Sequence, residues 1–91
     1  MEQRVVLITG AGRGVGRCMA ETFARAGDAL IIADIVLARA EETAAMVAGS
    51  GAGAIAVQVD VGAGPAVAKM VAEGIARFGR LDVLINAAGS Y

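Results

Sequence analysis

A glycine-rich stretch, Thr9-Gly10-Ala11-Gly12-Arg13-Gly14-Val15-Gly16, is the part of the sequence whose residue types point most directly to chemistry. It follows an apolar run at residues 5–8 and precedes a segment with helical spacing, so we expect the local order strand, turn and helix. Glycines let the backbone turn tightly and approach a ligand closely, because they carry no Cβ. The first N–H groups of a helix and its dipole attract anions. The stretch therefore predicts a phosphate-binding site.

An acidic side chain, Asp34, follows a second apolar run at residues 29–33, eighteen residues after Gly16. At the carboxyl end of a strand, a carboxylate can accept hydrogen bonds from both hydroxyls of an adenine ribose. The same carboxylate would repel a 2′-phosphate, so Asp34 favours NAD over NADP. The structural alternative is a solvated residue at a strand end, and the spacing from the glycines favours the ribose interpretation.

Polar or glycine residues also follow two further apolar runs. Asp60 ends the run at residues 55–59, and Asn86, Ala87, Ala88 and Gly89 follow the run at residues 81–85. Ligands of open α/β sheets bind at the edge formed by the carboxyl ends of the strands. Loops that are polar by chance remain an alternative for any one strand end, but they explain polar or glycine residues at all four strand ends poorly. A Walker phosphate loop is excluded, because no Gly-Lys-Ser/Thr follows Gly10.

The elements that must position these residues can be read from the apolar pattern. The continuous apolar run at residues 5–8 is typical of a strand covered on both faces, and the run at residues 29–33 is of the same buried type. All four runs read as strands, and they alternate with helical patterns at residues 15–26, 37–48 and 65–78. On the first helix we expect Val15, Met19, Phe23 and Ala26 to face the core. Pro65 suits the first position of the third helix. Consecutive βαβ units with right-handed crossovers predict an α/β fold with a doubly wound parallel sheet.

Composition restricts the function further. The 91 residues carry a net charge of −1 with both signs interspersed, which does not suggest binding to nucleic acid or to a membrane surface. With one Cys and no His, a disulfide framework and imidazole catalysis by these residues are excluded, and almost no ligands remain for a zinc site. Glycines interrupt the longest charge-free stretch, residues 43–59, which rules it out as a membrane span. No secretion signal is recognisable, and the unpaired Cys18 suits a reducing compartment, so we expect a cytoplasmic protein.

Three motifs together resemble the classical short-chain dehydrogenase/reductases. Thr9-Gly10-x-x-x-Gly14-x-Gly16 is similar to the cofactor fingerprint of that family, and Asp60-Val61 to its adenine-contacting pair. Residues 79–89, with the sequence GRLDVLINAAG, are similar to its fourth strand and following turn. The resemblance covers essentially the whole chain. It implies that residues 1–91 form the N-terminal part of an NAD(P)-binding Rossmann domain, with four strands in the order 3-2-1-4 and three helices.

The resemblance also implies roles for individual residues. Asp34 would bind the adenine ribose, Asp60 and Val61 the adenine edge, and Asn86 would brace the central sheet. Ala87, Ala88 and Gly89 would run past the ribose on the nicotinamide side. The residues expected around the pyrophosphate and its ribose are Gly10, Arg13, Gly14, Val15 and Gly16. In this family a basic residue at the position of Arg13 often helps to hold NADP, but the carboxylate of Asp34 lies closer to the deciding group, and NAD remains the expected cofactor.

The catalytic segment of the family has no counterpart in these residues. Family members support hydride transfer with a Ser, a Tyr and a Lys four residues after the Tyr, all downstream of the Asn-Ala-Ala-Gly turn. Tyr91 is the last residue of the sequence, Lys69 lies within the expected third helix, and Ser90 reads as a loop residue. We therefore assign no catalytic residue and no metal ligand. The sequence predicts the cofactor-binding part of an oxidoreductase acting on an alcohol or carbonyl, truncated and inactive as a 91-residue chain.

Two other functions remain open from the sequence. A non-catalytic dinucleotide-binding or interaction module made by truncation would keep the same glycine turn and Asp34. An adenosylmethionine-dependent transferase also uses a glycine turn and a ribose-binding acid, but the matches at Asp60-Val61 and at residues 86–89 disfavour it.

In the family order the fourth strand would be an open, apolar sheet edge, which predicts self-association or pairing with the missing C-terminal half.

Overall fold

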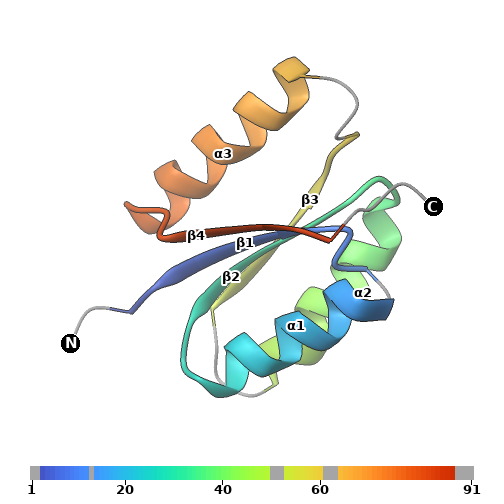
Figure 1. The fold of residues 1–91 in the computed structure, drawn as a ribbon, viewed down its shortest axis with the longest axis vertical. Coiled ribbons are helices and arrows are strands. Elements are labelled where there is room, and N and C mark those ends of the chain that lie inside the picture. Colours follow the sequence, from blue (N-terminus) through green and yellow to red (C-terminus); the bar gives the residue numbers. More distant parts are fainter. Residues whose placement is uncertain (1–2, 13, 50–52, 61–63, 88–91) are drawn as a thin grey trace.

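The computed structural model describes residues 3–12, 14–49, 53–60 and 64–87, in which strands and helices alternate along the chain (Figure 1). The strands are β1 (Val5–Thr9), β2 (Ala29–Asp34), β3 (Ala54–Gln58) and β4 (Val83–Asn86). The helices are α1 (Gly14–Arg25), α2 (Leu37–Ala48) and α3 (Gly64–Phe78). The predicted order of elements is confirmed.

The four strands form one parallel sheet in the order β3-β2-β1-β4, which is the order that the family resemblance implies. Thr9 at the end of β1 is in register with Ala33 of β2 on one side and with Asn86 of β4 on the other. Asp34 is in register with Gln58 at the end of β3. The last residues of all four strands therefore lie along the same edge, which we call the carboxyl edge.

Helices cover both faces of the sheet (Figure 1). On one face, Val6, Ile8, Leu30 and Ile32 form a buried cluster with small residues of α1 and α2. On the other face, Leu7 and Ile31 pack with Met70 of α3. Every residue of β1 and β2 is buried, whereas β3 and β4 are partly exposed along their length. The two runs expected to be buried, at residues 5–8 and 29–33, are therefore covered on both faces.

The inward face of α1 differs from the prediction. Met19 and Phe23 pack against the core, but Val15 is 68% exposed and Ala26 is exposed, so placing these two in the core was wrong. The buried residues of this helix are instead Gly16, Ala20 and Ala24. These small residues let α1 lie close to the chain beneath it, since a Cβ on Gly16 would collide with the carbonyl oxygen of Gly10.

The boundaries of three later elements differ slightly from the sequence prediction. β4 begins at Val83 rather than at residue 81, because Asp82 bonds Val5 partly through its side chain. The N–H of Asp82 donates to the Val5 carbonyl at 3.0 Å, while Oδ2 of Asp82 accepts the N–H of Val5 at 2.8 Å. β3 covers Ala54–Gln58 rather than 55–59, and Pro65 is the second residue of α3 rather than the first.

Candidate functional site

The glycine loop joins β1 to α1 at the carboxyl edge. Gly10 has φ +66° and Gly14 has φ +61°, both in the left-handed region that residues with a Cβ rarely adopt. The chain leaves the sheet at Gly10 and enters the helix at Gly14 through these two conformations. The tight turn predicted from the glycines is therefore present.

The two sides of this loop are not equivalent. On the inner side Gly16 lies against the Gly10 carbonyl, leaving no room for a side chain. At Gly14 a Cβ would meet no heavy atom within 4 Å from the described residues outside its chain neighbours and its own helix, so none of these residues fills the space beside the first turn of α1. The first N–H groups of a helix have no partner within the helix, and its dipole favours an anion there. An open, Cβ-free approach to a helix N-terminus fits a pyrophosphate.

The carboxylate of Asp34 is fastened to the backbone on both of its oxygens. Oδ2 accepts the Gly12 N–H at 3.0 Å, and Oδ1 accepts the Val36 N–H at 2.9 Å, just before α2 begins. Asp34 is only 6% exposed, so the alternative of a solvated strand-end residue is wrong. A carboxylate has about four lone-pair sites, so each oxygen can still accept one further hydrogen bond. That is the acceptor pair that two ribose hydroxyls require.

A backbone hydrogen bond adds to this attachment. The N–H of Ala11 donates to the Ala33 carbonyl at 3.0 Å, and the next N–H, that of Gly12, donates to Asp34. Two consecutive donors thus tie the glycine loop to the end of β2. The phosphate side and the ribose side of the candidate site are therefore one connected unit.

β4 is attached to the other side of β1. The hydroxyl of Thr9 donates to Oδ1 of Asn86 at 2.8 Å, and the N–H of Ala87 donates to the Thr9 carbonyl at 3.2 Å. Asn86 thereby connects the last residues of two strands that are 77 positions apart in the sequence. The chain that follows β4 begins its course at the carboxyl edge.

Eight of the twelve site residues predicted from the sequence lie in the described part of the chain, and all of them are at the carboxyl edge. They are Gly10, Gly14, Val15, Gly16, Asp34, Asp60, Asn86 and Ala87. Asp60 is exposed and follows Val59, whose N–H donates to the carbonyl of Asp34 at 3.0 Å. The other four, Arg13, Val61, Ala88 and Gly89, lie outside the described residues.

Sequence reasoning missed one residue of this site, Gly12. It stands at a variable position of the glycine motif, and only its contact with Asp34 shows its place in the site. The signal that could have found it is that residues 10–16 contain four glycines, whereas the motif requires only three.

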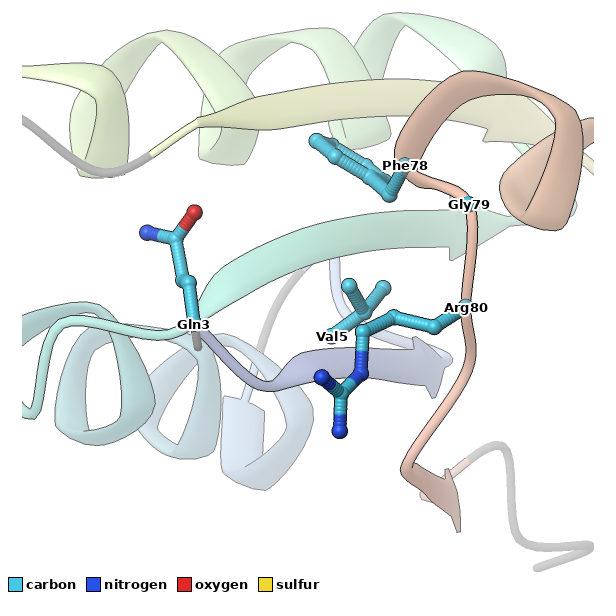
Figure 2. A pocket seen from close by; sticks show the side chains of 5 residues that line it. All are labelled: Gln3, Val5, Phe78, Gly79 and Arg80. Carbon is cyan, nitrogen blue, oxygen red and sulfur yellow. The ribbon is translucent and has the colours of Figure 1, made fainter. Parts of the chain in front are cut away.

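A pocket of about 380 Å³ lies at the opposite, amino edge of the sheet, lined by Gln3, Val5, Phe78, Gly79 and Arg80 (Figure 2). Its polar side chains bond within the protein. Gln3 donates to the Gly27 carbonyl at 2.7 Å, and the guanidinium of Arg80 pairs with Asp82 at 2.6 Å. Because the glycine loop and Asp34 are at the other edge, this pocket is not the candidate site.

Charge pairs stabilise the amino edge. Hydrogen bonds from Arg80, followed by that from the Val5 N–H, hold the pKa of Asp82 below its usual range. The Arg4 guanidinium forms bidentate hydrogen bonds with the Asp28 carboxylate, at 3.0 and 2.8 Å, which raises the pKa of Arg4 above its ordinary value.

The described residues contain no cluster of His, Cys, Asp and Glu that could hold a metal. Within the same residues, no helix is both long and apolar enough to span a bilayer.

Comparisons with known proteins agree on one family. A sequence model described as short chain dehydrogenase matches residues 4–91. Galactitol 2-dehydrogenase of Agrobacterium fabrum is 42% identical over 91 residues, which is all of this chain and 34% of that protein. The short-chain reductase protein NovJ of Streptomyces niveus is 39% identical over 88 residues, or 97% of this chain and 34% of that protein. The chain thus spans about a third of the length of these relatives.

A solved structure shows the same fold. The crystal structure of hydroxysteroid dehydrogenase from Escherichia coli superimposes with a TM-score of 0.92 and is 31% identical in sequence. The match covers 96% of this chain and 37% of the chain of that enzyme.

Proposed function

The chain belongs to the short-chain dehydrogenase/reductase family, and we propose that it forms the cofactor-binding part of an NAD-dependent oxidoreductase acting on an alcohol or a carbonyl. The observation that carries this proposal is the Asp34 carboxylate, held beside an open glycine loop with one acceptor site left on each oxygen. The relatives include a dehydrogenase and a reductase, which supports a redox reaction.

We assign the parts of the cofactor to the carboxyl edge. The pyrophosphate and its ribose would be held by Gly10, Arg13, Gly14, Val15 and Gly16. Asp34 would accept hydrogen bonds from the adenine ribose, with Asp60 and Val61 at the adenine. Ala87, Ala88 and Gly89 would pass the ribose on the nicotinamide side, on a strand held in place by Asn86. When bound, the nicotinamide supplies or accepts the hydride, and the residues of this chain bind and orient it.

NAD is favoured over NADP by the charge of the Asp34 carboxylate and by the two hydrogen bonds that hold it in place. A 2′-phosphate would replace a hydroxyl that donates to the carboxylate with a group that carries negative charge and only accepts. Two backbone N–H groups hold this carboxylate in place, so moving it away from a phosphate would break both hydrogen bonds.

Turnover requires groups that residues 1–91 do not provide in the arrangement of the family. No Tyr in this sequence is followed four residues later by Lys. We therefore expect the 91-residue chain by itself to bind the cofactor without catalysing hydride transfer.

The exposed thiol of Cys18 favours a reducing compartment, and we propose that the protein acts in the cytoplasm.

β4 is an edge strand of the sheet, and its Leu84 is 56% exposed. Unpaired N–H and C=O groups on an apolar edge strand promote pairing with another strand. We propose that this edge pairs either with the C-terminal half of the protein or, in the isolated 91-residue chain, with a second copy.

The proposal can be tested by calorimetric titration of the protein expressed from its complete coding sequence. We expect NAD⁺ to bind more tightly than NADP⁺, and D34A to weaken NAD⁺ binding by about tenfold or more, because hydrogen bonds to a charged group contribute about 1.5–3 kcal/mol. The matched control is E41A, an exposed carboxylate on α2. A wild-type protein that binds neither dinucleotide would overturn the proposal.

A further inference from the structure

Gly12 leaves no space for a side chain between the glycine loop and the start of α2. A Cβ placed on it would lie 2.6 Å from Oδ2 of Asp34 and 2.5 Å from the Cβ of Arg39. Real Cβ atoms essentially never come within 3.0 Å of a heavy atom that is not bonded to them, so both neighbours would have to move away from the added Cβ. The Cβ of Arg39 belongs to α2 and is fixed by the helix backbone, whereas the carboxylate can rotate. A side chain at position 12 would therefore displace the carboxylate of Asp34 and would also push the glycine loop and the start of α2 apart.

The N–H of Gly12 also contributes directly to the placement of this carboxylate. It donates to the same oxygen, Oδ2, that the missing side chain leaves room for. Asp34 is 6% exposed, and burying a charge is costly unless hydrogen bonds compensate for it. Gly12 thus provides both the space and one of the two hydrogen bonds that keep the carboxylate at the site.

We infer that Gly12 is a positioning residue for cofactor selection: it holds the Asp34 carboxylate where it accepts from a 2′-hydroxyl and rejects a 2′-phosphate. This inference rests on the proposed function, because it assigns the discrimination between NAD and NADP to the pair Gly12 and Asp34 rather than to Asp34 alone. Gly12 acts through Asp34 and need not touch the cofactor itself.

The test uses ligands without the nicotinamide, so that it does not depend on turnover. The affinities of ADP-ribose and of 2′-phospho-ADP-ribose are measured by calorimetry on the complete protein and on G12A. We expect the wild type to prefer ADP-ribose. In G12A the affinity for ADP-ribose should fall by about tenfold, through the loss of a charge-assisted hydrogen bond, while the affinity for the 2′-phosphate should change little. The preference should therefore shrink by about the same factor.

Two further variants separate positioning from a general structural role. G49A adds a Cβ at the end of α2, where the Met46 carbonyl oxygen would be at an ordinary 3.4 Å, and it should leave the preference unchanged. In a D34A background, G12A should cause no additional change in preference, because the carboxylate on which Gly12 acts is gone.

If G12A does not fold, the double variant G12A/R39G removes the helix atom in the way and leaves only the carboxylate to move, with R39G alone as its control. This double variant should fold and show the reduced preference. A wild type that prefers ADP-ribose together with a folded G12A that keeps this preference would overturn the role of Gly12 and leave the proposed function standing. Failure of both variants to fold would assign Gly12 to the fold alone and would also overturn it. A wild type that binds neither ligand would instead overturn the proposed function.

Discussion

The hydroxyl of Thr9 donates a hydrogen bond of 2.8 Å to Oδ1 of Asn86, and this bond joins the ends of β1 and β4 directly beside the glycine loop. Thr9 is 3% exposed, whereas Asn86 is exposed. The two residues come from opposite ends of the sequence, so their contact fixes the position of the last described strand relative to the first. The chain after β4 therefore starts from a defined point at the candidate site.

Replacing Thr9 by Val should lower the free energy of unfolding by about 1 kcal/mol, because one side-chain hydrogen bond is lost while the shape of the side chain is kept. Water can reach Asn86 and hydrogen-bond to it in place of Thr9, which limits the loss of unfolding free energy. Urea unfolding measures the change. T22V is the matched control: Thr22 is exposed and its hydroxyl bonds only the Cys18 carbonyl of its own helix, so the loss there should be smaller. Equal losses in the two variants would contradict the role of the Thr9–Asn86 bond.

Asp82 should make the stability of the protein depend on acid. Its pKa is lowered in the folded state by Arg80 and by the Val5 N–H. The stabilisation is therefore fully present above its unfolded pKa of about 3.9 and is lost as the pH falls through the lower folded value. The difference in unfolding free energy between wild type and D82N should be constant near neutral pH and should shrink below about pH 4.

Chemical unfolding across this pH range tests the prediction for Asp82. E41Q, which changes an exposed carboxylate on α2, serves as the control and should show a smaller dependence on pH. A gap between wild type and D82N that stays constant down to pH 2 would show that Asp82 stabilises the β1–β4 contact without its charge.

Gly16→Ala should separate α1 from the glycine loop, because the added Cβ would collide with the backbone carbonyl of Gly10. Forcing an extra carbon into a packed site costs typically about 1–3 kcal/mol. Gly53→Ala is the control, since among the described residues its Cβ would meet a Phe78 ring atom at an ordinary 3.5 Å. Thermal unfolding of both variants measures the effect. A G16A protein as stable as G53A would mean that the helix can shift without cost.

The isolated 91-residue chain should self-associate at micromolar concentration through the edge of β4. A lysine at Leu84 should weaken that association, because a charge on an edge strand opposes pairing with another strand. Ile75→Lys on α3 is the control, as Ile75 is similarly exposed, at 44%, but lies on a helix. Sedimentation velocity distinguishes the species. A wild-type chain that sediments as a monomer would contradict the prediction.

The sequence predicted the elements well because the apolar runs are continuous and glycines separate them, whereas the order of the strands in the sheet came from the family resemblance. The sequence-based prediction failed where side-chain packing or a side-chain hydrogen bond, rather than the periodicity of apolar residues, decides the local structure. α1 faces the sheet through Gly16, Ala20 and Ala24, since small residues permit a closer approach than the larger Val15 would allow. β4 starts late because the side chain of Asp82 takes a hydrogen bond that a backbone carbonyl would normally accept.

In the candidate site, too, the sequence predicts which residues are present but not how they are oriented. The position of Asp34 at the end of β2 follows from the sequence, but the direction of its carboxylate does not. That direction depends on the N–H groups of Gly12 and Val36, which reach it only after the loop and the start of α2 have folded together. Residue types predict the members of such a site, while backbone donors decide how they are held.

The central claim is that the carboxyl edge of this sheet binds the dinucleotide, and amide NMR of the complete protein during titration with NAD⁺ tests it most directly. We predict chemical-shift changes concentrated at the amides of Gly10, Gly12, Gly14 and Ala87. The amides of Gln3 and Arg80, which line the pocket at the amino edge, should remain unchanged. Changes concentrated around that pocket, or no changes at a large excess of NAD⁺, would contradict the claim.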